Sequence, residues 1–136
     1  MGIVYTLQNG KKMNASAFCR YLYRKIEKTS GKLGIKKEGN VERTARGSSI
    51  YCLDDAAIEI IYSLMANKKT KTKKSPFLFC LKKELELYGK LKHIKLKFIE
   101  YNGLKLEIQN MFGALEKQHK EIKYSIVNAF LQLKEL

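Results

Sequence analysis

Apolar side chains recur at intervals of three and four residues along most of this chain, and this spacing restricts the folds that it can adopt. The spacing predicts helices over residues 14–31, 54–65, 82–92, 104–118 and 121–134. A chain of 136 residues, 45% of them hydrophobic, is long enough for one compact core and too short for two ordinary ones. We therefore expect one small domain over residues 1–136, a helix-rich α/β or α+β fold with four to five helices around a minimal sheet.

Few segments have the pattern of a strand. Residues 3–7 are β-rich and run into Asn9-Gly10, a turn dipeptide that favours positive φ, so we expect a short hairpin with residues 11–13. Residues 94–98 alternate apolar side chains with lysines, which is typical of a strand with one solvated face. We further expect a brief strand over residues 50–53 and a polar connector over residues 34–49.

The chain is strongly basic, with 27 lysine and arginine residues against 13 acidic ones and a net charge of +14. Residues 1–75 carry 16 basic and 6 acidic side chains, a net charge of +10, whereas residues 76–136 carry only +4. This excess indicates a polyanionic partner, RNA or DNA, contacted mainly through the N-terminal half. Because lysine far outnumbers arginine, bidentate recognition is less favoured, and a basic surface that serves solubility alone is the alternative.

Two segments concentrate this charge. The predicted helix over residues 14–31 and its end present cations with Tyr21 and Tyr23 between them, which suits phosphate contacts and stacking on unpaired bases. These cations are Arg20, Arg24, Lys25, Lys28 and Lys32. Residues 67–75 form a lysine-rich segment that we interpret as a flexible exposed loop, with Lys68, Lys69, Lys71, Lys73 and Lys74 as candidate phosphate contacts. In both segments, a merely solvated surface is the alternative interpretation.

The three cysteines favour neither a disulfide framework nor a metal site. Cys19, Cys52 and Cys80 are odd in number and lie 33 and 28 residues apart, without a C-x-x-C pair. No apolar run approaches the roughly 20 residues of a membrane span, and the N-terminus lacks the pattern of a signal peptide. We expect a cytoplasmic protein with no membrane partner, no metal and no cofactor.

Asp54 and Asp55 are adjacent carboxylates at the start of the helix predicted over residues 54–65, directly after Cys52. One or two carboxylates seldom hold a magnesium ion alone, so a magnesium role would need phosphates to complete the coordination. A thiol at a helix N-terminus can be activated as a sulfur carrier. The alternatives are an N-cap that also favours the helix dipole, and a cysteine that is a small core residue. Asp54, Asp55 and Cys52 are thus the candidate catalytic residues.

Four segments carry a resemblance to a known family. Residues 115–130 resemble the C-terminal helices of archaeal and eukaryotic tRNA 2-thiolation enzymes of the PP-loop ATPase superfamily. Residues 77–88, with Glu84 and Tyr88, are similar to an earlier helix of that family, and residues 53–61 to its leucine-aspartate-aspartate segment. Residues 15–37 are similar to the basic helix ahead of its phosphate loop. The resemblance implies a shortened PP-loop-like fold and tRNA as the partner.

The sequence departs from that family at its chemical sites. The family binds ATP on a serine-glycine-glycine-x-aspartate-serine loop, whose glycines let backbone amides approach phosphate, and the only distantly similar string here is Gly47-Ser48-Ser49. Tyr51 and Cys52 replace the histidine that precedes the aspartates in the family, and the cysteines of its iron-sulfur cluster have no counterpart set.

Three functions follow from these observations. The first is a tRNA- or RNA-binding protein related to the tRNA thiolation machinery and acting without ATP-dependent catalysis. The second is a minimal tRNA sulfurtransferase that uses Asp54, Asp55 and Cys52 with ATP and magnesium, its phosphate loop supplied by a partner chain. The third is an interaction module in which residues 104–136 pack on another protein or on a second copy of the chain.

Overall fold

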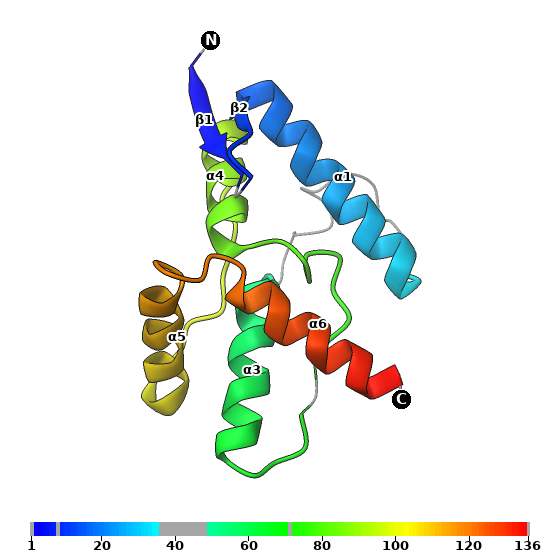
Figure 1. Cartoon of the computed structure of the whole chain (residues 1–136). Helices are drawn as coiled ribbons and strands as arrows, with labels where there is room; N and C mark the ends of the chain where they lie inside the picture. Colours follow the sequence, from blue (N-terminus) through cyan, green and yellow to red (C-terminus); the bar gives the residue numbers. More distant parts are fainter. Residues whose placement is uncertain (1, 8, 36–48, 71, 136) are drawn as a thin grey trace.

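A computed structural model describes residues 2–7, 9–35, 49–70 and 72–135 (Figure 1). In this part of the chain, two strands and five helices follow one another along the sequence. They are β1 (Ile3–Thr6), β2 (Lys12–Asn14), α1 (Ala15–Leu33), α3 (Leu53–Met65), α4 (Lys82–Lys92), α5 (Gly103–Leu115) and α6 (Ile122–Glu135). The expectation of a small helix-rich domain with a minimal sheet is confirmed.

The N-terminal hairpin leads directly into α1. β1 and β2 pair antiparallel, and Gly10 takes a φ of 89° in the turn, which glycine adopts without the strain that a Cβ would cause. Asn14 then caps α1, since its side-chain oxygen accepts a hydrogen bond from the Ala17 N–H at 2.9 Å. The helix runs two residues past its predicted end because Gly34, at φ 69°, provides the left-handed C-cap.

The core consists of two clusters, one at each end of the molecule. The hairpin-side core lies between the hairpin, α1 and α4, and its buried side chains include Phe18, Leu22, Ile26, Leu85 and Tyr88. The C-terminal core lies between α3, α5 and α6, and its buried side chains include Leu53, Ile58, Ile108, Phe112 and Val127. Figure 1 shows this division, with α6 crossing α3 in the lower half and α1 running down one side.

The strand predicted over residues 94–98 is wrong. The alternation of exposed lysines and half-buried apolar side chains is present, but in the described residues this segment pairs with the rest of the chain only through an isolated parallel bridge between Phe98 and Ile50. The strand expected over residues 50–53 likewise reduces to that bridge. An alternating pattern indicates that successive side chains face solvent and protein in turn. A strand also needs hydrogen bonds to the backbone of a neighbouring strand, and the pattern does not specify these.

Two further expectations are corrected or fall outside the described residues. The helical spacing of apolar residues over 54–65 predicts a buried face that includes Leu64 and Met65, but these two side chains are 70% and 61% exposed in the last turn of α3. Most of the connector expected over residues 34–49, including Gly47 and Ser48, lies outside the described residues. None of the described helices is both long enough and apolar enough to cross a membrane.

Candidate nucleic-acid interface

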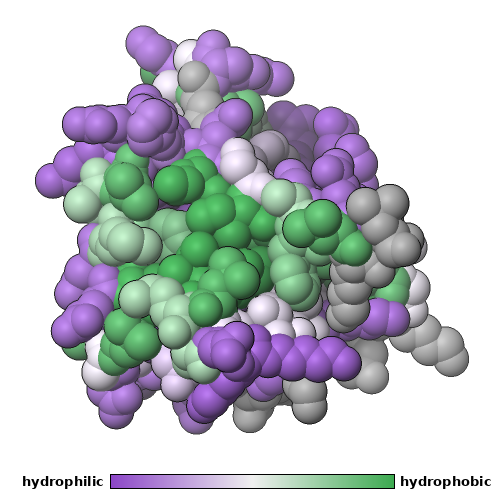
Figure 2. All heavy atoms as spheres, turned by 60° about the horizontal axis from the view of Figure 1, so that its bottom comes forward, coloured by the Kyte–Doolittle hydropathy of each residue, from purple (hydrophilic) through white to green (hydrophobic). Residues whose placement is uncertain are grey.

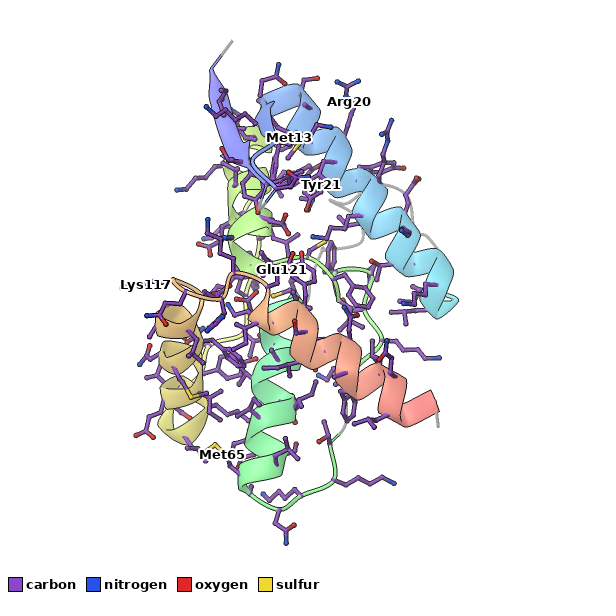
Figure 3. All side chains as sticks on the ribbon, in the orientation of Figure 1. Met13, Arg20, Tyr21, Met65, Lys117 and Glu121 are labelled. Atoms are coloured by element: carbon purple, nitrogen blue, oxygen red, sulfur yellow. The ribbon has the colours of Figure 1, made fainter. Side chains whose placement is uncertain are left out.

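A basic hollow lies where the hairpin meets the first turns of α1. Its volume is about 340 Å³, and Lys11 and Lys12 line it from the hairpin while Arg20 and Arg24 line it from α1. All four cationic residues are exposed, and the remaining described lining consists of uncharged residues. Arg20 points outward from the helix in Figure 3. Four cations around a concave surface without a carboxylate favour the binding of a phosphate group.

The cations continue along α1 as a stripe. Arg20, Arg24, Lys28 and Lys32 follow one another at intervals of four residues, and all four are exposed. Residues four apart lie on the same side of a helix, so the stripe extends for about 18 Å. It adds a linear run of positive charge to the basic hollow. Four of the five cations predicted on this helix therefore share one surface.

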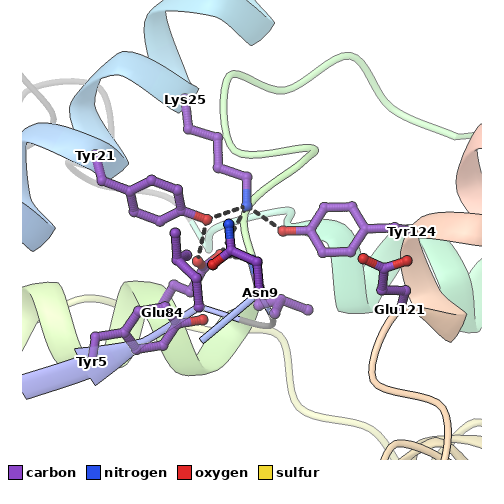
Figure 4. A pocket seen from close by; sticks show the side chains of 9 residues that line it. Tyr5, Asn9, Tyr21, Lys25, Glu84, Glu121 and Tyr124 are labelled. Atoms are coloured by element: carbon purple, nitrogen blue, oxygen red, sulfur yellow. Dashed lines mark hydrogen bonds and ion pairs between the residues drawn. The ribbon is translucent and has the colours of Figure 1, made fainter. Parts of the chain in front are cut away.

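Lys25 is the exception, because it points into a second hollow instead of solvent. Its Nζ donates to Glu84 Oε1 at 3.2 Å and to the Tyr21 hydroxyl at 3.0 Å, and it also donates to the Tyr124 hydroxyl (Figure 4). The side chain of Glu84 is 1% exposed, and its second oxygen accepts from the Tyr21 hydroxyl at 2.8 Å. We call this hollow, of about 370 Å³, the tyrosine pocket.

The tyrosines of this pocket stay protonated. Burial first, and then the negative charge of Glu84, raise the pKa of the Tyr5, Tyr21 and Tyr124 hydroxyls well above their ordinary value. Each hydroxyl can therefore act as a hydrogen-bond donor at neutral pH. The pocket combines aromatic rings with the Lys25–Glu84 ion pair and Glu121, whereas the basic hollow carries net positive charge.

The lysine-rich loop forms a separate basic surface at the far end of α3 (Figure 1). Lys68, Lys69, Lys73 and Lys74 are exposed, and Lys71 lies outside the described residues. Two of these lysines cover aromatic rings, since the Nζ of Lys68 is 5.7 Å from the Tyr62 ring centroid and that of Lys73 is 5.9 Å from that of Tyr51. The structure does not bring this loop together with the basic hollow.

The candidate catalytic residues lie at the start of α3, where they hold helices in place. Asp55 Oδ2 accepts the Cys52 backbone N–H at 2.8 Å and the Cys52 thiol at 3.2 Å, while Asp55 Oδ1 accepts the Tyr101 hydroxyl at 2.5 Å. Asp54 accepts the Lys82 backbone N–H at 2.8 Å and the Lys123 ammonium at 2.5 Å. Both carboxylates thus have partners inside the protein. The N-cap of α3 is Cys52 and not an aspartate, but Asp54 and Asp55 lie in the first turn, where their charge favours the helix dipole.

The same surroundings keep the Cys52 thiol protonated. Burial raises its pKa well above the ordinary range, and the charges of Asp55 and Asp54 raise it further. A sulfur carrier or nucleophile needs the opposite shift, because the thiolate is the reactive form. This geometry gives no support to a catalytic role for Cys52.

Comparison with known proteins gives one structural likeness. The sequence matches no protein-family profile, and no curated protein matches it either. The fold is similar to that of the U34-tRNA thiolase NcsA from Methanococcus maripaludis, solved with its [4Fe-4S] cluster, with a TM-score of 0.50 and 22% sequence identity. The match covers 90% of this chain. This protein has a distant tRNA-thiolase-like fold. It spans about 45% of the thiolase chain.

The cysteines of this tRNA-thiolase-like chain do not fit an iron-sulfur cluster. Such a cluster needs several thiolates directed at one point. Here the Cys52 thiol is directed at Asp55, and burial raises the pKa of Cys80 to about 12. Across the described residues, no three histidine, cysteine or acidic side chains gather closely enough to hold a metal.

Sequence reasoning missed two sets of site residues. Lys11 and Lys12 were assigned to the hairpin but not to the interface, although a strand that leads directly into a basic helix must place its charges beside the first turns of that helix. Tyr5, Glu84 and Tyr124 were also missed as pocket residues, because they lie far apart along the chain and only the packing of β1, α4 and α6 brings them together.

Proposed function

We propose that this protein binds RNA, with tRNA as the leading candidate, and that it is related to the tRNA thiolation machinery without using ATP-dependent catalysis. The observation that carries the proposal is the basic hollow of Lys11, Lys12, Arg20 and Arg24, which continues into the stripe along α1. The tRNA-thiolase-like fold supports tRNA over other RNAs.

The charge of this surface suits the backbone of a nucleic acid. Each phosphate that a cation neutralises releases a counterion, so a stripe of four cations together with the two hairpin lysines supplies affinity that depends on salt and not on sequence. Other hollows are less suited. A hollow of about 750 Å³ has Glu86 and Glu100 in its lining beside Lys82 and Lys97, so its cations are offset, unlike those of the basic hollow.

The hydrogen-bond partners of Asp54 and Asp55 do not favour catalysis at this site. A carboxylate that binds magnesium has to turn at least one oxygen toward the ion and its phosphates. Here Asp54 is paired with Lys123, and Asp55 accepts three hydrogen bonds at the start of α3. The sulfurtransferase alternative would require these bonds to be broken or shared.

The first test is binding of tRNA across a salt series, with a DNA duplex of equal charge as control and with ATP present or absent. We expect steep salt dependence, preference for tRNA and no effect of ATP. Replacing Arg20 and Arg24 together by glutamine should lower the logarithmic salt slope by roughly 1.4 and weaken binding about 10- to 30-fold at 0.1 M salt, because two phosphate contacts are lost.

A matched variant controls for the loss of overall charge. Lys90 and Lys92, exposed on the last turn of α4, are replaced by glutamine in the same background, and this pair should leave the salt slope nearly unchanged. Equal losses from the two double variants would contradict the proposed interface. Binding that becomes tighter with ATP would instead favour the sulfurtransferase function.

The apolar side of the molecule favours a second candidate function, protein interaction. Figure 2 shows a continuous apolar area on the lower side of the domain. Large exposed apolar side chains from three helices contribute to the surface, namely Leu64, Met65, Leu104, Leu106, Met111 and Leu133. Met65 lies between the lower ends of α3 and α5 in Figure 3. Exposed apolar surface of this kind is typical of contacts with another protein.

A further inference from the structure

We infer that the tyrosine pocket takes up one unpaired nucleobase of a bound single-stranded RNA segment while an adjoining phosphate lies in the basic hollow. This inference rests on the proposed RNA binding and assigns a recognition element to it. The geometry that points to it is the position of the pocket directly beside the basic hollow, with Leu7 and Tyr21 lining both.

The pocket has the size and the walls of a small aromatic site. Its volume of about 370 Å³ lies at the lower end of the range of about 300–1,000 Å³ for small-molecule pockets. The ring of Tyr5 lies 6.4 Å from that of Tyr21 at an interplanar angle of 26°, and Tyr124 lines the pocket from α6. Aromatic rings on several sides favour a flat ligand that stacks, and each of the four bases has such a face.

Two of the charged groups in the pocket, Lys25 and Glu84, neutralise each other, and Glu121 on the rim leaves a net negative charge. Glu84 accepts bonds from the Leu81 N–H at 2.9 Å, from Lys25 and from Tyr21, and Lys25 is bonded in turn to Tyr124. Because this pair is already compensated and Glu121 adds a negative charge, the pocket does not attract a phosphate. An uncharged base suits it better than a phosphate does, whereas the neighbouring basic hollow has the opposite preference.

The rim can read the edge of a base. Asn9 lines the pocket from the hairpin; its Oδ1 accepts the Lys11 N–H at 3.0 Å, and its NH2 group is a donor. Glu121 lines the pocket ahead of α6 and offers acceptors (Figure 4). These are the group types that recognise the hydrogen-bonding edges of bases. A base stacked in a duplex cannot present both a free face and a free edge, so the pocket selects single-stranded RNA.

The arrangement along α1 matches one nucleotide. Arg24 faces the basic hollow and Lys25, the next residue, faces the tyrosine pocket, with Tyr21 one turn earlier between the two. A base and its own phosphate are joined through a single sugar. One nucleotide can therefore place its base in one hollow and its phosphate in the other.

The experiment compares two short RNA backbones with the same number of phosphates, one fully abasic and one carrying a single central 2-aminopurine. We expect the base to tighten binding about tenfold with no change in salt slope, since stacking adds affinity without another phosphate contact. Because the chain has no tryptophan, quenching of the 2-aminopurine fluorescence on binding can be followed directly.

The pocket is tested from both its wall and its rim. Tyr5→Leu removes a stacking ring, and Glu121→Phe fills the entrance from an exposed position, so the second variant stays informative if the first fails to fold. Both should abolish the gain from the base. Glu107→Phe makes the same change in charge and bulk at an exposed position of α5, outside the pocket, and Tyr62→Leu removes a tyrosine from α3, also outside the pocket; both of these controls should keep the gain.

The outcomes separate this inference from the proposed function. If both backbones bind with the same affinity and a steep salt slope, RNA binding stands and the nucleobase pocket is overturned. If neither backbone binds, the proposed function itself fails. A free nucleoside monophosphate that binds as tightly as the one-base RNA would overturn the assignment to RNA and identify a site for small nucleotides.

Discussion

At the scale of the residue, the polar side chains of this protein divide into those with internal partners and those that face solvent. At the start of α3, Asp55 accepts hydrogen bonds from Cys52, and Asp54 accepts one from the Lys82 N–H. Lys25 donates to Glu84 and to two tyrosine hydroxyls. Arg20 and Arg24, only one turn from Lys25, are exposed. The residue type alone therefore does not indicate which cation meets a ligand, since exposure decides it.

Thiol reactivity gives a direct measure of this division. Cys52 and Cys80 are buried with raised pKa values, about 12 for Cys80, whereas Cys19 is half-buried. We expect iodoacetamide at neutral pH to modify Cys19 in the folded protein and all three cysteines after unfolding in urea, as read by mass spectrometry of peptides. Modification of folded Cys52 as fast as in the unfolded chain would contradict the buried, protonated thiol and revive the catalytic hypothesis.

At the scale of the element, one lysine joins three helices. Lys123 of α6 lies 2.5 Å from Asp54 at the start of α3 and 2.7 Å from Glu116 at the C-cap of α5. Burial opposes its charge, but the two carboxylates outweigh that effect and raise the pKa of Lys123 above 10.5. The packing of α3, α5 and α6 therefore depends on this ammonium group remaining charged.

The pH dependence of stability tests this role. The Lys123 ammonium interacts more favourably with its surroundings in the folded state than in the unfolded state. Its contribution to the stability of the fold is therefore complete below pH 10.5 and is lost as the pH rises through its higher pKa in the folded state. We expect Lys123→Met to lower the free energy of unfolding by about 3 kcal/mol at neutral pH, because two partly buried carboxylates lose their countercharge. The difference from wild type should shrink above pH 10.5, as measured by urea unfolding.

A second lysine provides the matched control. Lys105 of α5 pairs with Glu59 of α3 at 3.2 Å, but the two side chains are 32% and 30% exposed. Lys105→Met should cost under about 1 kcal/mol, since solvent screens such a pair. If Lys123→Met lowers the free energy of unfolding by no more than Lys105→Met does, the buried ion pairs of Lys123 add nothing to the packing of the three helices.

At the scale of the whole molecule, the two ends differ in character. The hairpin end carries the basic hollow and the tyrosine pocket beside the hairpin-side core, while the opposite end exposes apolar side chains around the C-terminal core (Figure 2). An RNA bound at one end leaves the other free for a protein. The two candidate functions are therefore compatible in one chain.

Self-association measures the second function. If the apolar face joins two copies, sedimentation at high salt should detect a dimer, because salt screens the repulsion between chains of net charge +14 and leaves apolar contacts intact. Leu64→Gln should abolish the dimer, whereas Ile3→Gln, at a 58% exposed position on β1, should not. A monomer at every salt concentration would exclude this face as a contact between copies.

Local sequence patterns predict the helices and the hairpin of this protein, and its composition predicts a positively charged surface. Helical spacing, the Asn14 cap and the Asn9-Gly10 turn act over a few residues, so α1, α3, α4, α5, α6 and the hairpin could be predicted from local patterns. The excess of basic residues in the N-terminal half depends only on composition. The stripe of cations along α1 could also be predicted, because residues four apart lie on the same side of a helix. It consists of Arg20, Arg24, Lys28 and Lys32.

Which side chains lie next to one another depends on the tertiary structure. Tyr5, Glu84 and Tyr124 come from β1, α4 and α6, and no local pattern specifies that they surround one pocket. Packing also determines that residues 94–98 form a single bridge and no strand in the described part of the chain, that Leu64 is exposed, and that Lys25 points inward. The physical reason is that local propensity acts between near neighbours in the sequence, whereas burial, pairing and pKa depend on residues that only the folded chain brings together.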